Sequence, residues 1–423
     1  MTHSVVIGAG IVGACSALEL LREGHGVTIL EPGLPGGEQA ASYGNGCWLS
    51  PMSVIPPAVP GLWRKVPGFV ADPLGPLAIR WRYLPRAAPW LLRYLLSGWT
   101  EARVARTAVA LRALLRDAPA LHASLAEEAG VGELIRRRGL MYVYPSRAEF
   151  EAEAMAWRIR RSVGIEWLEI PAEEMRQREP QLDRRYGFGV LVEEGGHCLD
   201  PGAYVAALAE LARARGARLL GRSATGFRIE SGRLRAVLTD AGEIAADRAV
   251  VCAGARSRAL AAAAGSRVPL ETERGYHAMI EPAPGEDLPG PRTPLMPSDG
   301  KMSITMTRRG LRCAGQVEIA GLEAAPNWRR AEILRDHLLR SFPALPRSLP
   351  AERVRVWMGH RPSMPDGLPC LGPARGTRDV ALAFGHGHVG LVAGPRTGRV
   401  VAQLLGGRAP EMDLAPYDPA RFR

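Results

Sequence analysis

The sequence is poor in lysine, and its cysteines are isolated from one another. Lys65 and Lys301 are the only lysines among the 54 basic side chains, so arginine carries nearly all of the positive charge. The six cysteines include no CxxC pair, and none has a histidine or cysteine partner at metal-ligand spacing. This pattern argues against a zinc site and against a disulfide framework. We therefore expect no metal and a reducing, cytoplasmic compartment.

Charged side chains are also missing from residues 1–18, which makes a signal peptide or a membrane helix worth considering. No lysine or arginine precedes the apolar run, unlike in a signal peptide. Glycines at spacings of two and three are costly inside a helix. Both interpretations are therefore disfavoured.

The 54 basic and 43 acidic residues give a net charge of +11. Clustered cations would indicate nucleic acid or an anionic membrane as a partner. The arginines are instead spread along the chain, which favours a generally basic, solvated surface, and no nucleic-acid partner is expected. A hydrophobic fraction of 47% over 423 residues indicates a globular protein large enough for two domains.

What the sequence does contain is a dinucleotide-binding pattern at its start. An apolar run leads into Gly8, Gly10 and Gly13, and a second apolar run ends at Glu31. The glycines allow a tight turn, close approach of a pyrophosphate and packing of the helix on its strand. The acid is placed to accept from a ribose hydroxyl, and the start of the helix supplies N–H donors. The residues predicted to contact a dinucleotide here are Gly8, Gly10, Ile11, Val12, Gly13 and Glu31.

The rest of the chain alternates helical and strand-like segments. Residues 51–89 contain too many prolines for regular helix, and residues 90–129 have helical apolar spacing. A further helix is expected near 147–162. Another is expected at 200–215, where Asp200 and Pro201 are typical of a helix start. Strands are expected at 139–144, 186–192, 217–220, 225–230, 234–239, 248–254, 268–280 and 302–317. The strands between 217 and 239 resemble a β-meander, and residues 380–405 indicate strand, glycine-rich turn and helix.

Four motifs make the chain resemble the flavin-dependent D-amino-acid oxidase and glycine oxidase superfamily, most closely its D-amino-acid dehydrogenases. The first is the opening glycine turn with its acid. The second is Ser42-Tyr-Gly-Asn-Gly46 followed by Ser50-Pro51, and the third is residues 251–257. The fourth combines Gly359-His-Arg-Pro362, Asp366-Gly367 and residues 385–390. In the third motif, Arg256 stands where the family more often has tryptophan.

The resemblance covers most of the chain and implies an α/β fold with an α+β insert. The expected architecture is a Rossmann-type FAD-binding domain of the glutathione-reductase and D-amino-acid-oxidase kind, with an interleaved antiparallel-sheet substrate domain. The expected FAD-binding domain comprises residues 1–75, 195–262 and 350–423. The expected substrate domain comprises residues 76–194 and 263–349.

The late glycine-rich turn at residues 385–390 favours FAD over NAD as the cofactor. Such a turn at the start of a helix can place backbone donors against a flavin. No cysteine stands at a family position for covalent attachment, so non-covalent FAD is predicted. Besides the first turn, cofactor contacts are expected from Ser42, Asn45, Gly46, Ala253, Gly254, Gly385, His386, Gly387, Gly390 and Leu391.

The resemblance assigns Arg361 to the carboxylate of an amino acid substrate, because a planar guanidinium matches a carboxylate with two hydrogen bonds. The alternative is a surface arginine paired with Asp366. Tyr276 and His277 are expected on the strand that lines the other side of the cavity, although Tyr276 is equally compatible with an ordinary half-buried aromatic. His388 is expected to provide a polar substrate contact.

Three histidines of these motifs, His360, His386 and His388, invite comparison with a metal site. They lack a convincing ligand set, so polarity of the pocket is the favoured interpretation.

The implied reaction is oxidative deamination of a D-amino acid, in which the α-hydrogen leaves as hydride to the flavin. The polar groups His277 and His388 could receive a hydroxyl, so cis-4-hydroxy-D-proline is a substrate to test beside D-proline and D-alanine. A quinone or another electron carrier is the expected acceptor. The alternatives are an oxygen-using glycine or secondary-amine oxidase, a flavin subunit of a heteromeric dehydrogenase, and a tRNA-modifying flavoprotein, although no fused methyltransferase or RNA module is evident.

Residues 81–99 mix tryptophan, leucine and arginine, as interfacial helices do. A helix that packs between domains is the favoured interpretation. Peripheral contact with the inner face of a membrane is the other.

Overall fold

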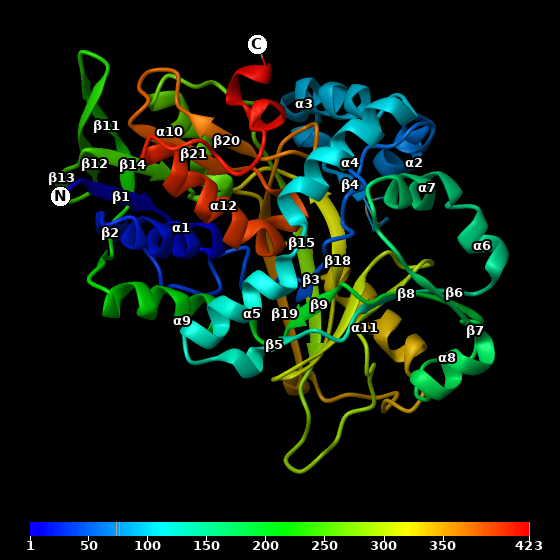
Figure 1. Cartoon of the computed structure of the whole chain (residues 1–423). Helices are drawn as coiled ribbons and strands as arrows, with labels where there is room; N and C mark the ends of the chain where they lie inside the picture. Colours follow the sequence, from blue (N-terminus) through cyan, green and yellow to red (C-terminus); the bar gives the residue numbers. More distant parts are fainter. Residues whose placement is uncertain (73, 76, 423) are drawn as a thin grey trace.

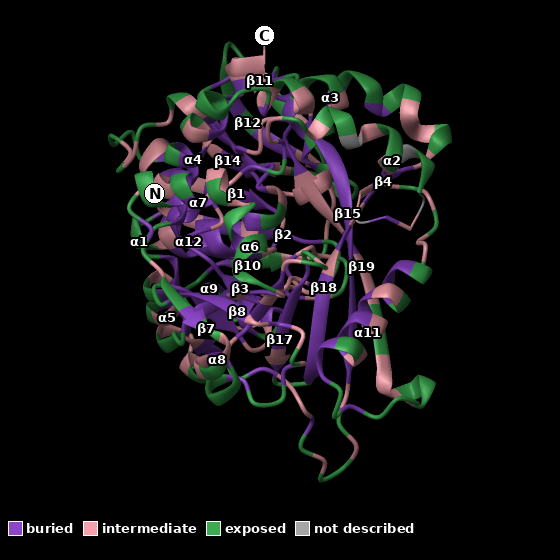
Figure 2. Cartoon of the chain, turned by 90° about the vertical axis from the view of Figure 1, so that its right-hand side faces the viewer, coloured by how far each residue is buried: buried purple, intermediate pink, exposed green. Residues whose placement is uncertain are grey.

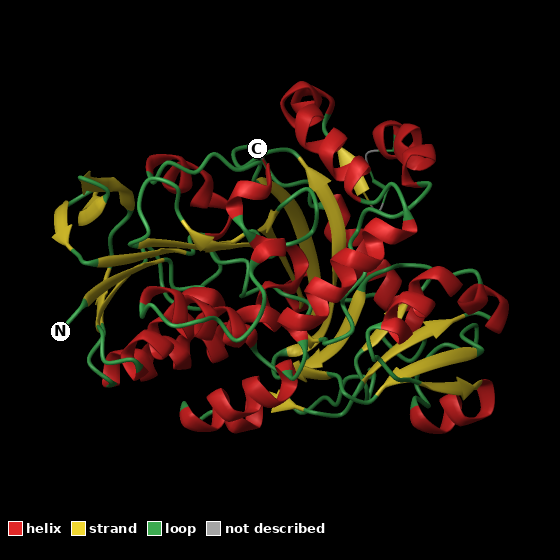
Figure 3. Ribbon diagram, turned by 45° about the horizontal axis from the view of Figure 1, so that its top comes forward, coloured by secondary structure: helices red, strands yellow, loops and turns green. Residues whose placement is uncertain are grey.

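The computed structural model describes residues 1–72, 74–75 and 77–422. Two large β-sheets organise the molecule (Figure 1). Figure 3 shows the long strands of one sheet at the centre and the shorter strands of the other nearer the N-terminus, with helices around both. No helix within the described residues combines the length and apolar character needed to span a bilayer.

The six-stranded sheet has the order β10-β2-β1-β14-β21-β20. Neighbouring strands are parallel, except that β20 is antiparallel to β21. The strands are β1 (His3–Ile7), β2 (Gly26–Leu30), β10 (Arg218–Leu220), β14 (Arg248–Val251), β20 (Cys370–Pro373) and β21 (Val380–Phe384). The chain thus enters this sheet at its beginning, middle and end. The turns that follow β1, β14 and β21 therefore meet at one edge.

Two helices from opposite ends of the chain pack against each other beside this sheet. They are α1 (Ile11–Arg22) and α12 (Gly390–Leu405), blue and red in Figure 1. The absence of a side chain at Gly398 permits their close approach, because a Cβ there would lie 2.7 Å from the carbonyl carbon of Cys15. The first glycine-turn helix is therefore covered by the last helix of the chain.

The nine-stranded sheet has the order β19-β15-β18-β17-β16-β6-β8-β7, with β4 also paired to β18. Its long central strands are buried, as Figure 2 shows in purple for β15 and β18. The strands are β4 (Leu77–Ile79), β6 (Leu140–Tyr144), β7 (Leu168–Pro171), β8 (Phe188–Val192), β15 (Glu271–Ile280), β16 (Leu295–Pro297), β17 (Ser303–Thr307), β18 (Gly310–Ile319) and β19 (Val354–Ser363).

The two faces of β15 have different surroundings, because side chains alternate along a strand. Tyr276, Ala278 and Ile280 belong to a hydrophobic cluster with residues of α11 (Arg329–Ser341). The opposite face carries Glu273, Gly275 and His277. It looks toward the loop that contains Gly44, because the His277 ring hydrogen-bonds to the carbonyl of Gly44.

The remaining elements cover these sheets or form small ones. Two three-stranded sheets have the orders β11-β12-β13 and β3-β9-β5. Their strands are β3 (Trp48–Leu49), β5 (Ile135–Arg136), β9 (Gly196–Cys198), β11 (Ala224–Glu230), β12 (Arg233–Thr239) and β13 (Gly242–Ala245). The other helices are α2 (Val66–Ala71), α3 (Leu84–Ser97), α4 (Glu101–Leu115), α5 (Ala118–Glu128), α6 (Arg147–Glu151), α7 (Ala154–Ser162), α8 (Ala172–Arg178), α9 (Pro201–Ala214) and α10 (Ser257–Ala263).

The structure confirms the α/β fold and the helix that begins after Asp200, and it divides the strand expected at 302–317 into the hairpin of β17 and β18. It also confirms that residues 90–129 are helical, divided among three helices because the chain turns at Gly98 and at Asp117, whose φ is +62°. The proline-rich segment 51–89 is also more helical than predicted, since it contains α2 and the start of α3. Pro73 and Pro76 of this segment lie outside the described residues.

Two features of the sheets differ from expectation. Residues 218–220 do not belong to a β-meander, because β10 pairs in parallel with β2 in the six-stranded sheet. Residues 354–363 form the edge strand β19 of the nine-stranded sheet, although the expected division places 350–423 in the FAD-binding domain. The strand nevertheless continues toward the late glycine turn, so it connects the two sheets.

Candidate active site

The first glycine turn, between β1 and α1, is held in place by steric contacts. Gly8 has φ +107°, and a Cβ there would lie 2.7 Å from the carbonyl oxygen of Cys252. A Cβ on Gly13 would lie 1.8 Å from the carbonyl oxygen of Gly8. Gly10 is different, because a Cβ there would approach only Ser42 Oγ, at 3.6 Å. The turn is therefore tightly packed on the protein side and open at Gly10, where a phosphate can approach the helix N-terminus.

The acid at the end of β2 supports this turn directly. Glu31 Oε2 accepts from the backbone N–H of Ala9 at 2.8 Å, and Oε1 accepts from the N–H of Gly33 at 3.1 Å. A carboxylate has about four acceptor positions, so both oxygens keep capacity for a ribose hydroxyl. Ser42 makes a further contact, because its Oγ accepts from the N–H of Ile11 at 3.2 Å.

Two more glycine turns lie at the same edge of the sheet. Gly254 follows β14 with φ +55°. Apart from its two neighbours in the chain, no described heavy atom would lie within 4 Å of a Cβ at this position. Gly385 and Gly387 follow β21 with φ +88° and +55°. Gly390 and Leu391 begin α12, and the Leu391 carbonyl is held by His122 Nε2 at 2.9 Å. Backbone groups from residues 8–13, 253–254 and 385–391 therefore surround one edge.

The segment of residues 42–46 lies between the two large sheets. Arg312 of β18 donates to the carbonyl of Asn45 at 3.1 Å, and Thr305 donates to the carbonyl of Gly46 at 3.2 Å. A Cβ on Gly44 would lie 1.9 Å from the Trp357 ring, so only glycine fits there. These contacts fix the second motif beside the glycine turns.

These groups fit a bound FAD. The open positions at Gly10 and Gly254 let a ligand approach the backbone, and the start of α1 offers positive potential to a pyrophosphate. The residues that would hold the cofactor are those of the three turns together with Glu31, Ser42, Asn45 and Gly46. All six cysteines are buried and free, so no thiol is exposed on the surface of the site.

Arg361 lies on β19 opposite Glu273 of β15. Its guanidinium donates to the carbonyl of Gln316 at 2.8 Å and to that of Gly315 at 3.3 Å. A Cβ on Gly275 would lie 2.3 Å from Nη2 of Arg361, so the glycine gives the guanidinium its place over the strand. Arg361 keeps some accessible surface, yet burial lowers its pKa, against the opposing effect of Glu273.

The alternative partner of Arg361, Asp366, is engaged elsewhere. Its carboxylate forms an ion pair with Arg421 at 2.6 Å, and Arg421 also donates to the carbonyl of Leu368. Asp366 therefore belongs to the attachment of the C-terminal segment, and Arg361 remains available on the strand that leads to the late glycine turn.

A small cavity lies between β15, the late glycine turn and α3, and Arg361 is the cross-strand partner of one of its lining residues, Glu273. Glu273 and Ser363 line it from the sheet, His386 and His388 from the turn, and Tyr94 from α3. Glu273 was not singled out from the sequence. The available signal was its spacing in β15, which places it on the face of Gly275 and His277, but its position opposite Arg361 depends on strand pairing across 88 residues.

The histidines of this region are held neutral. Burial lowers the pKa of His388 to about 4, and the nearby Arg361 adds to that effect. By its accessible surface His388 is nevertheless an exposed residue that lines the cavity, so the effect of burial applies most directly to the buried His386. Burial also lowers the pKa of His386 to about 3, and its Nε2 hydrogen-bonds to Thr397 at 3.1 Å. Neutral imidazoles can both donate and accept, so His388 can contact a polar substrate group.

Of the four predicted substrate residues, only His388 lines this cavity. Arg361 is the strand partner of the lining residue Glu273, and Tyr276 and His277 lie elsewhere. Tyr276 lies on the opposite face of β15, where its hydroxyl donates to Glu318 at 2.6 Å and accepts from Asn327 N–H at 3.1 Å. His277 stacks on Trp357 and binds Gly44, and burial lowers its pKa to about 3. His277 is therefore close to the 42–46 segment rather than to Arg361.

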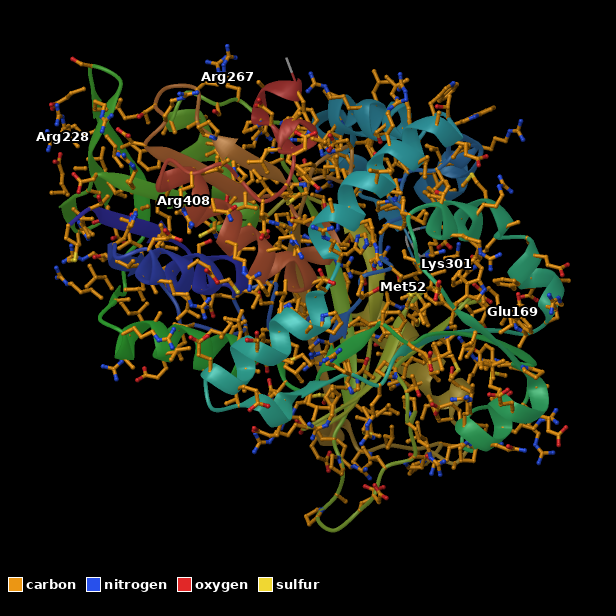
Figure 4. The ribbon with its side chains drawn as sticks, in the orientation of Figure 1. Met52, Glu169, Arg228, Arg267, Lys301 and Arg408 are labelled. Atoms are coloured by element: carbon orange, nitrogen blue, oxygen red, sulfur yellow. The ribbon has the colours of Figure 1, made fainter. Side chains whose placement is uncertain are left out.

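The third histidine of the motifs, His360, is also turned away, because its Nδ1 hydrogen-bonds to Thr272 on the other face of the sheet. Among the described residues, no three His, Cys, Asp or Glu side chains are grouped as metal ligands. The basic charge is dispersed too. Figure 4 shows the labelled Arg228, Arg267, Lys301 and Arg408 on separate parts of the molecule.

Comparisons with known proteins agree with this geometry. A family model described as FAD dependent oxidoreductase matches residues 3–404. A D-amino-acid oxidase of Bradyrhizobium diazoefficiens is 64% identical over 420 residues, covering 99% of each chain. A D-amino acid dehydrogenase of Paramagnetospirillum magneticum is 31% identical, covering 99% of this chain and 98% of the relative.

Solved structures of similar fold include two amine-oxidising enzymes. Glycine oxidase from Geobacillus kaustophilus superposes with a TM-score of 0.72 at 22% identity, covering 100% of this chain and 99% of the other. L-proline dehydrogenase from P. horikoshii superposes with a TM-score of 0.71 at 21% identity, covering 100% and 97%. At these identities the likeness concerns the fold alone.

Proposed function

The chain belongs to the FAD-dependent oxidoreductase family, and we propose that it catalyses the oxidative deamination of a D-amino acid. The observation that carries this proposal is the position of Arg361 on β19, directly opposite Glu273, whose side chain lines the cavity at the late glycine turn. A guanidinium there can hold the carboxylate of an amino acid next to the cofactor. The choice of D-amino acids is supported by the names of the Bradyrhizobium and Paramagnetospirillum relatives.

The roles of the protein groups follow from their geometry. Arg361 has five N–H donors, and its bonds to two backbone carbonyls fix the plane of the guanidinium while leaving donors for both oxygens of a carboxylate. Bound FAD supplies the hydride acceptor, and we propose that it is held without a covalent bond. The protein's contribution is to position the α-carbon of the substrate and to exclude water.

The substrates to which this proposal points are D-proline, cis-4-hydroxy-D-proline and D-alanine. His388 supports a substrate that carries a hydroxyl group, because its neutral ring faces the cavity. The cavity bordered by Pro56 and Tyr94 is narrow, with a volume of about 20 Å³, which supports a small or cyclic side chain over a long one. Higher kcat/KM for cis-4-hydroxy-D-proline than for D-proline would support a contact with the hydroxyl, and equal values would contradict it.

The proposed electron acceptor is a quinone or another carrier. Helix α3 supports it, because Leu92 and Leu96 are exposed while Trp90 packs inward. Exposed Trp81 and Trp99 border the same helix, as at a peripheral membrane surface. Oxygen is a second candidate, favoured by the oxidase name of the Bradyrhizobium relative.

One experiment tests both parts of the proposal. The purified holoenzyme is mixed with a panel of D- and L-amino acids, and flavin bleaching is followed without oxygen. We expect D-amino acids to bleach the flavin and L-amino acids to leave it oxidised. Reoxidation is then compared for oxygen, a soluble quinone and an artificial dye, and flotation with anionic vesicles tests the membrane surface. Bleaching by L-amino acids alone would contradict the proposed stereochemistry.

A further inference from the structure

A buried carboxyl group lines the cavity and is paired across two strands with the guanidinium that is to bind a carboxylate. Glu273 is the direct cross-strand partner of Arg361, so their Cβ atoms are about 5 Å apart. Glu273 is 7% exposed and lines the cavity. The two hydrogen bonds of Arg361 go to backbone carbonyls of β18, which leaves the Glu273 carboxylate facing the cavity.

This arrangement is unfavourable for a simple anion. A second negative charge beside Arg361 repels any carboxylate that binds there, and a buried carboxylate is costly without a partner. The arrangement is favourable for a zwitterion, whose cationic nitrogen and anionic carboxylate are attached to the same carbon. Arg361 and Glu273 present the opposite charges side by side on one face of the sheet.

We propose that Glu273 binds the amine of the substrate and accepts a proton from it. In this step a nitrogen–hydrogen bond of the ammonium group breaks and an oxygen–hydrogen bond forms on the carboxylate, and no electrons are transferred. The amine then has the lone pair that it needs when the α-hydrogen leaves as hydride. The inference rests on the proposed function and adds a proton acceptor to it.

The surroundings of Glu273 are compatible with this role. Burial raises its pKa, against the effects of the Arg361 guanidinium and the Ser363 hydroxyl. The neighbouring Glu271 on the same strand adds to the increase. A carboxyl with a raised pKa is a better proton acceptor near neutral pH than an ordinary one.

The other titratable groups at this cavity do not offer the same function. Tyr94 of α3 has a raised pKa, first because of burial and then because of Glu273, so its hydroxyl stays protonated. His386 and His388 of the late turn have lowered pKa values of about 3 and 4, which makes them weak bases. Glu273 is therefore the acidic group placed to exchange a proton there.

The test compares ligands with and without an amine on the holoenzymes of the wild type, Glu273→Gln and Glu271→Gln. Glu271 is a matched control, because it is a buried acid of the same strand that binds Tyr83 instead of lining the cavity. For Glu273→Gln, we expect kcat/KM for D-alanine to fall about 100-fold at pH 7. We expect propionate, which lacks the amine, to bind several-fold more tightly in calorimetry, since a repelling charge is gone.

The pH dependence provides a second readout. The difference in kcat/KM for D-alanine between the wild type and Glu273→Gln should become smaller as the pH rises, because more of the substrate amine is already neutral in solution. A purely structural role would weaken propionate binding and lower activity equally at all pH values, and that result would overturn the proposal. Unchanged kinetics in Glu273→Gln would also overturn it. If no D-amino acid reduces the wild-type flavin, the proposed function fails first, which is a distinguishable outcome.

Discussion

The two sides of the proposed active site, the proposed cofactor side and the proposed substrate side, are built from different chemical groups. On the cofactor side, backbone amides and glycines from three turns surround one sheet edge, and their positions are fixed by steric contacts such as that of Gly13 with Gly8. On the substrate side, Arg361, Glu273 and His388 project from a sheet face and from one turn. A substitution on the first side should therefore damage folding and cofactor binding together. A substitution on the second should change catalysis and leave the flavin bound.

The strongest test of this contrast is Gly13→Ala. Its Cβ would lie 1.8 Å from the Gly8 carbonyl oxygen, so the turn and α1 have to move apart. We expect a loss of stability of about 3 kcal/mol or more, together with loss of flavin during purification. Thermal unfolding and the flavin-to-protein absorbance ratio measure both effects. The control is Gly10→Ala, which should keep the melting temperature and lose only cofactor affinity.

Arg361→Lys tests the substrate side. A lysine offers a point charge in place of the planar fork, so kcat/KM for the best D-amino acid should fall about 100-fold, mainly through KM. The flavin content should equal that of the wild type. Arg421→Lys is the control, because Arg421 pairs with Asp366 and should affect stability but not KM. An unchanged KM in Arg361→Lys would remove this residue from the substrate site.

Acid should loosen the cofactor side through His122. Burial lowers the pKa of His122 to about 4 from 6.5, and its Nε2 holds the Leu391 carbonyl at the start of α12. As the pH falls, His122 is protonated in the unfolded chain before it is protonated in the folded protein. The stability contributed by the neutral imidazole is therefore complete above pH 6.5 and is lost as the pH falls toward 4. At pH 5 this lowers the free energy of unfolding by about 2 kcal/mol.

Thermal unfolding of wild type and His122→Gln at pH 7 and pH 5 measures this contribution. The variant should be less stable than the wild type at pH 7, but its stability should fall less between pH 7 and pH 5. Equal losses in both proteins would show that His122 is not responsible.

The smallest effect is expected for Glu31→Gln. A neutral amide accepts more weakly from the Ala9 N–H than the carboxylate does, so the Kd of the apoprotein for FAD should rise about tenfold. Fluorescence titration measures the change. Glu38→Gln, at an exposed acid nearby, is the matched control. A Kd equal to that of the wild type would mean that Glu31 serves neither the turn nor the ribose.

The contrast between the two sides also explains what was predictable. The cofactor side depends on local patterns: a strand, a glycine turn and a helix follow each other within about 20 residues, so Gly8, Glu31 and the late turn could be read directly. The substrate side depends on strand pairing. The relation of Glu273 to Arg361 exists only because β15 pairs with β19, and no local pattern specifies that register.

The direction of Tyr276 illustrates the same difference. Alternation along a strand separates Tyr276 from His277, and this much is visible in the sequence. Which face looks toward the cavity depends on where α11 packs, because that helix buries the Tyr276 face. The breaks at Gly98 and Asp117 were likewise hidden by continuous helical spacing.

The contact between α1 and α12 has a consequence for biosynthesis. Gly398 lies against Cys15, and a Cβ on Gly394 would lie 2.6 Å from a side-chain carbon of Ile11, so the first helix finds its packing partner nearly 400 residues later in translation. While the ribosome is still working, that helix has an uncovered apolar flank. Flavin capture is therefore expected only after the last helix has emerged, and a nascent chain stalled before residue 390 should remain colourless and need chaperone protection.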